Sequence, residues 1–384
     1  MLSHSVQLFF IQCLKTPTRC YTFLVCFEIQ VSLRSVPLFD IRVYLKVKSW
    51  LPKSSSVKMN IRKPVTVISS VILIFTAGIA LAQKPQQAEA VEVTILSSNL
   101  ANGATIGEWG FSALIQVDDK CILFDAGRYP DTVLRNAKVL NVDLSCVTDV
   151  VLSHFHFDHT TGLLPLFNKI RAENPNAFQR IHVAKGFFLS RQTPRMSGDD
   201  EWNGMIAARK ELEAQGVEFR IYSEPTEIMP SIWVTGPVVR THKENTYNKS
   251  FRMRVDNEWV EDFVPDSQGL TIVTVEGPIV LLGCGHSGSV NLLEQVQRSI
   301  QSHPILALMG GMHLFAASEV ELDWTAKNLN DIGIQHLMAG HCTGIEPLMR
   351  LREKLNLDRK TAVVGAVGSR FVLGEGIYPT KIVR

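Results

Sequence analysis

One stretch of the chain constrains its fold and chemistry more than any other: "VVLSHFHFDHTTGLLPLF", residues 150–167. It carries four metal-ligand side chains within six positions, namely His154, His156, Asp158 and His159. They follow the apolar run 150–152, which is typical of a buried strand end. Side chains of an extended segment alternate between two faces, so His154 and His156 point one way while Phe155 and Phe157 point into the core. The two histidines are therefore expected to bind one metal ion.

Asp158 and His159 fall where the chain turns, because the sequence that follows has the pattern of a helix start. The turn would direct the side chains of this second pair to a position next to the first metal ion. The cluster therefore predicts a two-metal site. Imidazole and carboxylate ligands suit zinc and also accept manganese or iron. We therefore expect two divalent metal ions, zinc first, with manganese or iron as alternatives. The competing interpretation, ordinary surface or core histidines, is disfavoured by the density of ligands.

Further ligands must come from elsewhere, because one cluster cannot complete two coordination spheres. Three downstream segments share the pattern of an apolar run, a glycine and a histidine: "LLGCGHSGSVN" with Cys284 and His286, "ALMGGMHL" with His313, and "HLMAGHCTG" with His341. Such a position presents a side chain at the carboxyl edge of a sheet. Four further histidines lack this setting and are predicted to be structural or exposed: His182, His242, His303 and His336. Of these, His182 is left open as a possible exception.

The N-terminal part of the chain predicts export. Residues 59–82, "MNIRKPVTVISSVILIFTAGIALA", have the basic start, apolar run and Ala-Leu-Ala ending of a secretory signal peptide, with cleavage before Gln83. A membrane anchor is the alternative, because the run approaches spanning length. Since a signal peptide begins a chain, Met59 is the expected start, and residues 1–58 are interpreted as a non-native or unstructured extension; a cytoplasmic tail is the alternative. The mature protein is expected to be periplasmic or secreted.

The charge of the chain changes once this leader is set aside. Residues 1–63 hold ten of the 39 Lys and Arg but only two of the 37 Asp and Glu, so the remainder has a net charge of −6. An acidic mature protein does not attract nucleic acid. The expected partner is a small-molecule substrate, and membrane contact is expected only if the signal segment is retained; the sequence does not predict the oligomeric state.

After the signal segment, strand and helix patterns alternate, which predicts an α/β fold with sheet inside and helices outside. We predict a linker at 83–90 and one folded domain at 91–384. Residues 187–266 are less regular and are interpreted as a cap-like insertion over the site. Four cysteines remain, and a disulfide is permitted in an oxidising compartment, although a chain of this size does not need one: Cys121, Cys146, Cys284 and Cys342.

The histidine cluster resembles the signature of the metallo-β-lactamase superfamily, and "LFDAG", residues 123–127, resembles its earlier aspartate motif. Together with "GCGHSGSVN", "GGMHL" and "HCTG", these motifs look like one branch, that of the methanopterin-pathway dihydropterin ribofuranosylaminobenzene phosphate synthase and its bacterial relatives. The resemblance covers about residues 91–374. It implies a four-layer αββα metallo-β-lactamase sandwich with the metal site along the sheet edges.

The resemblance also implies roles for individual residues. His154 and His156 would bind the first metal, Asp158 and His159 the second, and His341 resembles the last ligand. Asp125 would orient a ligating histidine from behind.

The chain departs from the superfamily at one point. The usual mid-chain histidine motif with its bridging aspartate is absent, and "GCGHSG" stands where that aspartate is expected. Either Cys284 or His286 could coordinate; His286 is favoured as the ligand, with Cys284 structural behind it. His313 could be a ligand or could contact the substrate.

Two bound metals lower the pKa of a shared water, hold the resulting hydroxide and polarise the group it attacks. The predicted function is therefore an exported metal-dependent hydrolase acting on a small ester, lactone or phosphoester, with Asp158 helping to orient the nucleophile. A pterin-type synthase or transferase is the alternative that the resemblance implies, although pterin biosynthesis draws on cytoplasmic precursors. A non-enzymatic metal-binding protein is a third possibility.

Overall fold

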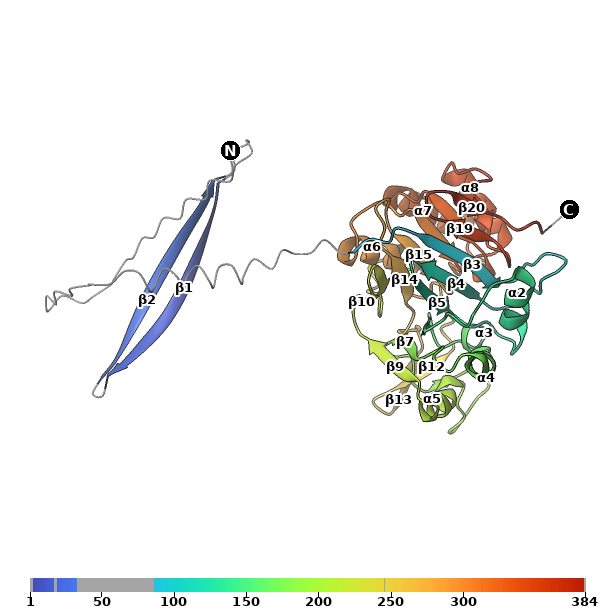
Figure 1. Cartoon of the computed structure of the whole chain (residues 1–384), viewed down its shortest axis with the longest axis horizontal. Coiled ribbons are helices and arrows are strands. Elements are labelled where there is room, and N and C mark those ends of the chain that lie inside the picture. Colours follow the sequence, from blue (N-terminus) through green and yellow to red (C-terminus); the bar gives the residue numbers. More distant parts are fainter. Residues whose placement is uncertain (1–2, 17–18, 33–85, 245, 383–384) are drawn as a thin grey trace. The chain divides into compact units, whose positions relative to one another are not determined.

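The structure is a computed structural model, which describes residues 3–16, 19–32, 86–244 and 246–382 (Figure 1). It divides into two units, residues 1–81 and 82–384. In the first unit, β1 (Ser3–Thr16) and β2 (Arg19–Ser32) pair as antiparallel strands, where the sequence shows no periodic pattern. The predicted signal peptide at 59–82 lies outside the described residues. Within the described ranges, no helix combines the length and the apolar composition that crossing a bilayer requires.

The second unit contains two large sheets. Eight strands are ordered β20-β19-β3-β4-β5-β6-β7-β9 in one, and seven are ordered β10-β11-β14-β15-β16-β17-β18 in the other. The strands of the first sheet are β3 (Val91–Ser97), β4 (Ser112–Val117), β5 (Lys120–Phe124), β6 (Asp149–Val151), β7 (Arg180–Ala184), β9 (Glu218–Tyr222), β19 (Arg370–Val372) and β20 (Gly376–Tyr378). Those of the second are β10 (Thr226–Met229), β11 (Ile232–Val234), β14 (Gly269–Ile272), β15 (Ile279–Leu282), β16 (Ala307–Gly310), β17 (His336–Ala339) and β18 (Ala362–Val364).

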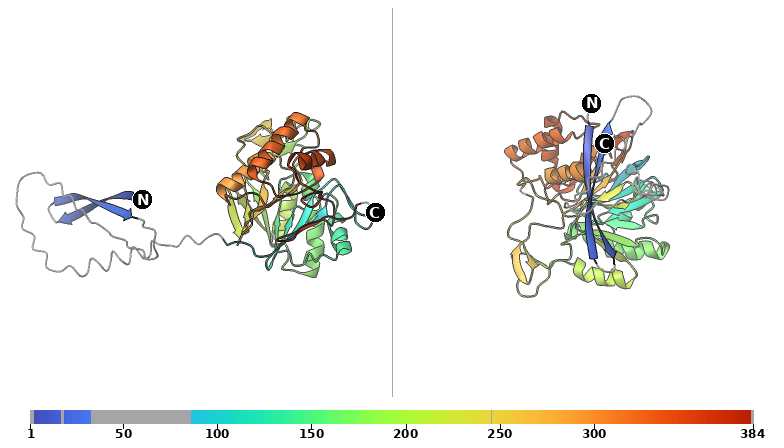
Figure 2. Two further views of the ribbon diagram at one scale, coloured as in Figure 1. Left: turned by 90° about the horizontal axis from the view of Figure 1, so that it is seen from above. Right: turned by 90° about the vertical axis from the view of Figure 1, so that its left-hand side faces the viewer.

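The helices lie on the outer faces of these sheets. One set covers the eight-stranded sheet: α2 (Thr132–Leu140), α4 (Leu163–Glu173) and α5 (Met205–Ala214). The other covers the seven-stranded sheet: α6 (Ser289–Ser299), α7 (Glu319–Ile332) and α8 (Ile345–Lys354). The single turn α3 (Phe157–Thr160) follows β6 and carries Asp158 and His159. Figure 2 shows the orange and red helices and the green helices on different sides of the unit.

Three separate hydrophobic cores show why this arrangement is stable. One core joins the eight-stranded sheet to its helices, one fills the space between the sheets, and one joins the seven-stranded sheet to its helices. Strand β15 illustrates the division, because Ile279 and Leu281 point into the middle core while Val280 and Leu282 point into the outer one. A strand buried on both faces is a continuous apolar run. The predicted four-layer αββα sandwich is confirmed.

Residues 187–266, interpreted from the sequence as a cap-like insertion, are shared between the main layers and a small separate sheet. Only a small sheet of order β13-β12-β8 stands outside the sandwich, made of β8 (Arg191–Gln192), β12 (Arg252–Val255) and β13 (Glu258–Glu261). Helix α5 and strands β9, β10 and β11 belong to the main layers. The sequence of this region looks irregular in part because β9 is an edge strand. Its positions are exposed or half-buried, so it lacks the continuous apolar run of an inner strand.

The folded unit also begins earlier than the predicted boundary at Val91. Ala88 is buried, and its backbone N–H donates to the carbonyl of Val273 at 2.8 Å. Cys121 and Cys146 form a disulfide with a Cα–Cα distance of 5.7 Å, whereas Cys284 and Cys342 are free and buried.

Candidate metal centre

Parallel strands bring the candidate residues to one edge of the sandwich. Strands β5, β6, β7 and β9 run parallel in one sheet, as do β15 to β18 in the other. The carboxyl ends of parallel strands lie at the same sheet edge, and there the chain leaves β6 toward His154, β15 toward Cys284, β16 toward His313 and β17 toward His341.

The first group of converging side chains consists of His154, His156 and His286. His156 Nδ1 lies 3.0 Å from His154 Nε2 and 3.1 Å from His286 Nε2. His154 and His286 are buried and His156 is half-buried. The structure thus brings His154 and His156, two of the three histidines of the sequence cluster, together with the downstream His286.

The outer nitrogens of two of these rings have partners that leave the inner nitrogens free. Ser153 donates its hydroxyl proton to Asp125, so its oxygen accepts from His154 Nδ1 at 2.9 Å. His286 donates from Nδ1 to the carbonyl of Thr246. Both Nε2 atoms therefore present lone pairs to His156, the protonation pattern expected of ligating histidines.

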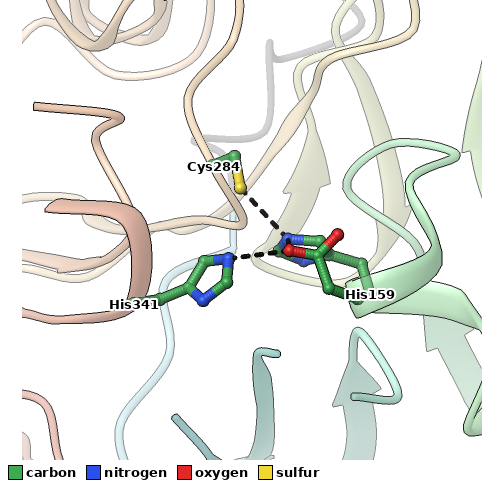
Figure 3. Close-up of side chains that lie close together, drawn as sticks. His159, Cys284 and His341 are labelled. Carbon is green, nitrogen blue, oxygen red and sulfur yellow. Dashed lines mark hydrogen bonds and ion pairs between the residues drawn. The ribbon is translucent and has the colours of Figure 1, made fainter. Parts of the chain in front are cut away.

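The second group consists of Asp158, His159, Cys284 and His341. His159 Nε2 lies 3.1 Å from Cys284 Sγ and 3.6 Å from Asp158 Oδ2, and His341 Nε2 lies 3.3 Å from the same carboxylate oxygen. Figure 3 shows His159, Cys284 and His341 meeting from three separate segments. The two groups adjoin, since the ring centroids of His154 and His159 are 4.3 Å apart.

Asp125, to which the resemblance assigns the support of a ligating histidine, contacts His159 from behind the second group. Its Oδ2 accepts from His159 Nδ1 at 2.7 Å, and its Oδ1 accepts from the backbone N–H of Ser153 at 2.7 Å. His341 is held in a similar way, because its Nδ1 lies 3.2 Å from Asn99 Oδ1. Each contact leaves an Nε2 atom facing the site.

Two glycines explain how Cys284 and His286 serve different groups. A Cβ at Gly283 would collide with Ser153 and Asp125, so only glycine lets the end of β15 approach β6 so closely. Gly285 has a φ of +66°, which breaks the alternation of an extended chain and separates the directions of Cys284 and His286. The thiol of Cys284, for which a structural role is predicted, faces the second group, and the ring of His286 faces the first.

Electrostatics keep most of these rings neutral. Burial lowers the pKa of His154 and His286 well below the usual value and lowers that of His156 to about 3. Burial also lowers the pKa of His341. Neutral imidazole is the form that binds metals, so these rings are ready ligands at neutral pH.

His159 and Asp158 behave differently because they face each other. Burial alone would lower the pKa of His159, but the carboxylates of Asp158 and Asp125 outweigh it and raise the pKa to about 9. Burial alone would raise the pKa of Asp158, but His159 and His341 outweigh it and lower that pKa. The second group thus pairs the Asp158 carboxylate with the cationic ring of His159.

The residues present fit bound cations, on two observations. His156 Nδ1 carries at most one proton, so at most one of its two short contacts is a hydrogen bond and the other brings two lone pairs together. In addition, His341 Nε2 is buried, and its 3.3 Å approach to Asp158 Oδ2 is not a well-aligned hydrogen bond. A cation in each group would bind these nitrogen lone pairs and so remove the free-energy cost of burying them unsatisfied. Histidine and thiolate ligands favour zinc, while the carboxylate also suits manganese.

His313 stands beside the two groups and is in neither. Its ring centroid lies 4.6 Å from that of His286, and burial lowers its pKa to about 4. It also lines a cavity of about 360 Å³, together with side chains such as Lys243, Tyr247 and Trp324. This position favours contact with a substrate over metal binding.

Some sequence expectations fail for local reasons. Phe157 is 39% exposed rather than in the core, because it begins helix α3 and is no longer in an extended segment. Asn99, Ser153 and Thr246 were not predicted, since a supporting contact through a hydroxyl or a backbone carbonyl has no motif. His182, left open, is buried with its ring nitrogens bonded to Tyr222 Oη at 2.8 Å and Asp149 Oδ1 at 2.7 Å.

The chain is similar in sequence to a known family and to two known proteins. A sequence model described as the metallo-beta-lactamase superfamily matches residues 110–175. The chain is 30% identical over 265 residues to the 7,8-dihydropterin-6-methyl-4-(beta-D-ribofuranosyl)-aminobenzene-5'-phosphate synthase of Methanocaldococcus jannaschii, covering 67% of this chain and 88% of that protein. It is 29% identical over 276 residues to an uncharacterized protein of the same organism, covering 72% and 98%.

Among solved structures, the chain is similar to the crystal structure of a metal-dependent hydrolase of the beta-lactamase superfamily. The TM-score is 0.59 and the sequence identity is 25%, over 73% of this chain and 98% of that one.

Proposed function

The chain belongs to the metallo-beta-lactamase superfamily, and on that premise we propose that it is a metal-dependent hydrolase with two divalent cations. The observation that carries the proposal is the pair of adjoining donor groups at one sheet edge, with His313 and a cavity beside them. Members of this superfamily are mostly enzymes, which supports a catalytic role. Zinc is the expected metal, with manganese or iron as alternatives.

The bound cations would supply a low-pKa water and would polarise the group under attack. The chain's own residues do the rest. His154, His156 and His286 would hold one cation, and Asp158, His159, Cys284 and His341 the other. Asp125 keeps His159 in one ring orientation and one tautomer, so that its Nε2 points into the site.

The proposed reaction is hydrolysis of a small ester, lactone or phosphoester. The oxygen of a water molecule attacks the carbonyl carbon or the phosphorus, the bond to the leaving oxygen breaks, and a proton from the water ends on that leaving oxygen. The Asp158 carboxylate would accept a hydrogen bond from the attacking water. His313, neutral at pH 7 because burial lowers its pKa to about 4, would donate an N–H to a substrate oxygen.

The cavity supports a small substrate. Its volume of about 360 Å³ is at the lower end of the usual range for small-molecule sites. Lys243 lines it and has no ion-pair partner among the described residues, which suits a substrate with an anionic group.

A synthase is the second candidate, because the relative of 30% identity is named as one. The same donor groups would then hold a phosphate-bearing substrate while another group is joined to it. The two candidates differ in their products, since hydrolysis consumes water and yields two fragments.

We also propose that the mature protein works outside the cytoplasm. The Cys121–Cys146 disulfide supports this, because disulfides persist in oxidising compartments and are rare in the cytosol.

The test is metal analysis of the purified protein combined with a substrate screen over lactones, phosphodiesters, phosphomonoesters and thioesters. We expect bound metal, turnover of at least one class, loss of that turnover with a chelator, and recovery when zinc or manganese is added. The variant His154→Ala should lose turnover, whereas His303→Ala, at an exposed histidine that belongs to neither group, should keep it. Metal-loaded protein without turnover of any class would count against a hydrolase and favour the synthase, which is then tested by product formation from a phosphate-bearing substrate and an amine.

A further inference from the structure

Two large aromatic side chains lie exposed beside the second donor group. Trp109 is 44% exposed and Phe315 is 52% exposed. Their ring centroids are 6.2 Å apart and the rings are nearly perpendicular, at 89°. Single exposed aromatics are common on protein surfaces, but two that meet from different loops form an apolar surface.

Both rings lie directly against candidate site residues. The Trp109 ring centroid is 5.2 Å from that of His341, and the Phe315 centroid is 5.1 Å from that of His313. A ligand resting on this pair would therefore have one end at the second donor group and could reach His313.

The backbone holds this pair in position. Next to Trp109, the N–H of Phe111 donates to the carbonyl of Asp158 at 3.2 Å, and the N–H of Phe315 donates to the carbonyl of Cys342 at 3.2 Å. Each loop is thus bonded to a segment that carries candidate ligands. Loops whose backbone is held in this way lose little backbone entropy when a ligand binds.

Other aromatic rings near the site already have partners on them. Phe157 has the guanidinium of Arg128 over its ring at 4.9 Å, and Trp202 packs edge-on against Phe155 and Phe251. Trp109 and Phe315 contact each other and the histidines of the site, and roughly half of each side chain remains open to solvent. A flat ring is the group that such a pair binds best, because aromatic rings gain from stacked and edge-to-face contacts with one another.

We propose that Trp109 and Phe315 form a recognition surface for a flat aromatic or heteroaromatic ring of the substrate. The substrate class is then an aryl or heteroaryl ester or phosphoester, with its ring on this pair and its acyl or phosphoryl oxygens at the two donor groups. The inference rests on the proposed function and narrows its substrate.

The test measures binding rather than turnover, at an alkaline pH at which all three probes are dianions: phenylphosphonate, cyclohexylphosphonate and methylphosphonate. Calorimetry on the zinc-loaded protein should show phenylphosphonate binding about three- to tenfold more tightly than cyclohexylphosphonate, which is as bulky but not flat. Methylphosphonate reports on the metal centre alone.

Variants of the two aromatic residues test whether they cause the preference for phenylphosphonate. In Trp109→Ala and in Phe315→Ala the preference for phenylphosphonate should disappear, while methylphosphonate affinity stays unchanged. Trp109→Phe should retain most of the preference. Trp259→Ala, which removes another partly exposed tryptophan on β13, is the matched control and should behave as the unaltered chain does.

Three outcomes overturn the inference: cyclohexylphosphonate binding as tightly as phenylphosphonate, a phenyl preference that survives in both alanine variants, or no binding of any phosphonate. A failure of the proposed function is recognised separately, because it appears as absent metal or absent turnover in the substrate screen. An enzyme with turnover but no phenyl preference would refute this inference alone.

Discussion

The Nε2 atom of His159 lies 3.1 Å from the Sγ atom of Cys284, although 125 residues separate them along the chain. His159 follows β6 of the eight-stranded sheet and Cys284 follows β15 of the seven-stranded sheet. The second donor group is therefore assembled across the two sheets. It exists only when the sheets are packed, so metal binding there should depend on intact folding.

The first prediction concerns this thiol. Cys284→Ser should lose about one of two bound ions, because the hydroxyl of serine is a far weaker ligand for zinc than thiolate. Cys342→Ser is the matched control: its Sγ is also buried but donates to the carbonyl of Cys284 at 3.6 Å, outside both groups. Metal analysis of both variants measures the difference. Two ions retained in Cys284→Ser would restore the purely structural role predicted from the sequence.

The second prediction separates the two donor groups. Asp158→Ala should empty the second group and leave the ion held by His154, His156 and His286, whereas His286→Ala should weaken the first. Turnover in Asp158→Ala should fall by roughly 10²–10⁴-fold even with one ion bound, because the nucleophile is no longer oriented. Asp119→Ala, on the exposed turn before β5, serves as the control. Equal loss from both groups in Asp158→Ala would show that the groups do not bind independently.

The third prediction concerns the contact behind His159. Asp125→Asn keeps the shape of the side chain but removes the charge that holds the Nδ1 proton of His159, whose distance to Asp125 is 2.7 Å. Metal affinity at the second group should fall by about 10- to 100-fold. The first group should lose less, because Asp125 reaches His154 only through the Ser153 hydroxyl. Competition with a coloured zinc chelator measures this. Unchanged affinity would mean that the charge of Asp125 is not needed to orient the His159 ring.

The fourth prediction concerns stability against acid at a site away from the metal groups. Asp149 accepts from both Nε and Nη2 of Arg180 at 2.6 Å and from His182 at 2.7 Å. Burial alone would raise the pKa of Asp149, but the hydrogen bonds from His182, Arg180 and Thr148 outweigh it and lower the pKa to about 2.

Because the pKa of Asp149 is lower in the folded state, its contribution to the free energy of unfolding is present above about pH 4 and is lost as the pH falls toward 2. The contribution amounts to about 2 kcal/mol. Asp149→Asn should therefore be less stable than the unaltered chain at pH 7, and the difference should shrink below pH 4. Urea unfolding of metal-free protein at several pH values tests this. A difference that stays constant with pH would contradict an ionised Asp149.

The fifth prediction concerns processing. If residues 59–82 are a signal peptide, mass spectrometry of the exported protein should find Gln83 at or near its N-terminus. Replacing Ala80 and Ala82 by bulky residues should block cleavage, because the small-residue pattern is what the peptidase reads. An intact N-terminal segment in a membrane fraction would favour the anchor instead.

Much of the centre could be predicted from the sequence because its first half is local. His154, His156, Asp158 and His159 lie on one strand end and the turn after it, so their directions follow from the geometry of a few residues. The α/β class was also predictable, since the inner strands are continuous apolar runs and helices alternate with them. The four-layer αββα arrangement was expected only from the family resemblance. The family resemblance rested on the same local motifs, and it is confirmed.

The rest was decided by tertiary structure. The turn at Gly285 and the close approach of Gly283 to Ser153 separate Cys284 from His286, and neither follows from residue type alone. Asn99 and Thr246 became supporting partners, and Trp109 met Phe315, only because loops from distant parts of the chain arrive at one sheet edge. The physical reason is that sequence periodicity encodes which face of an element is buried, whereas the contacts between loops depend on how whole sheets pack against each other.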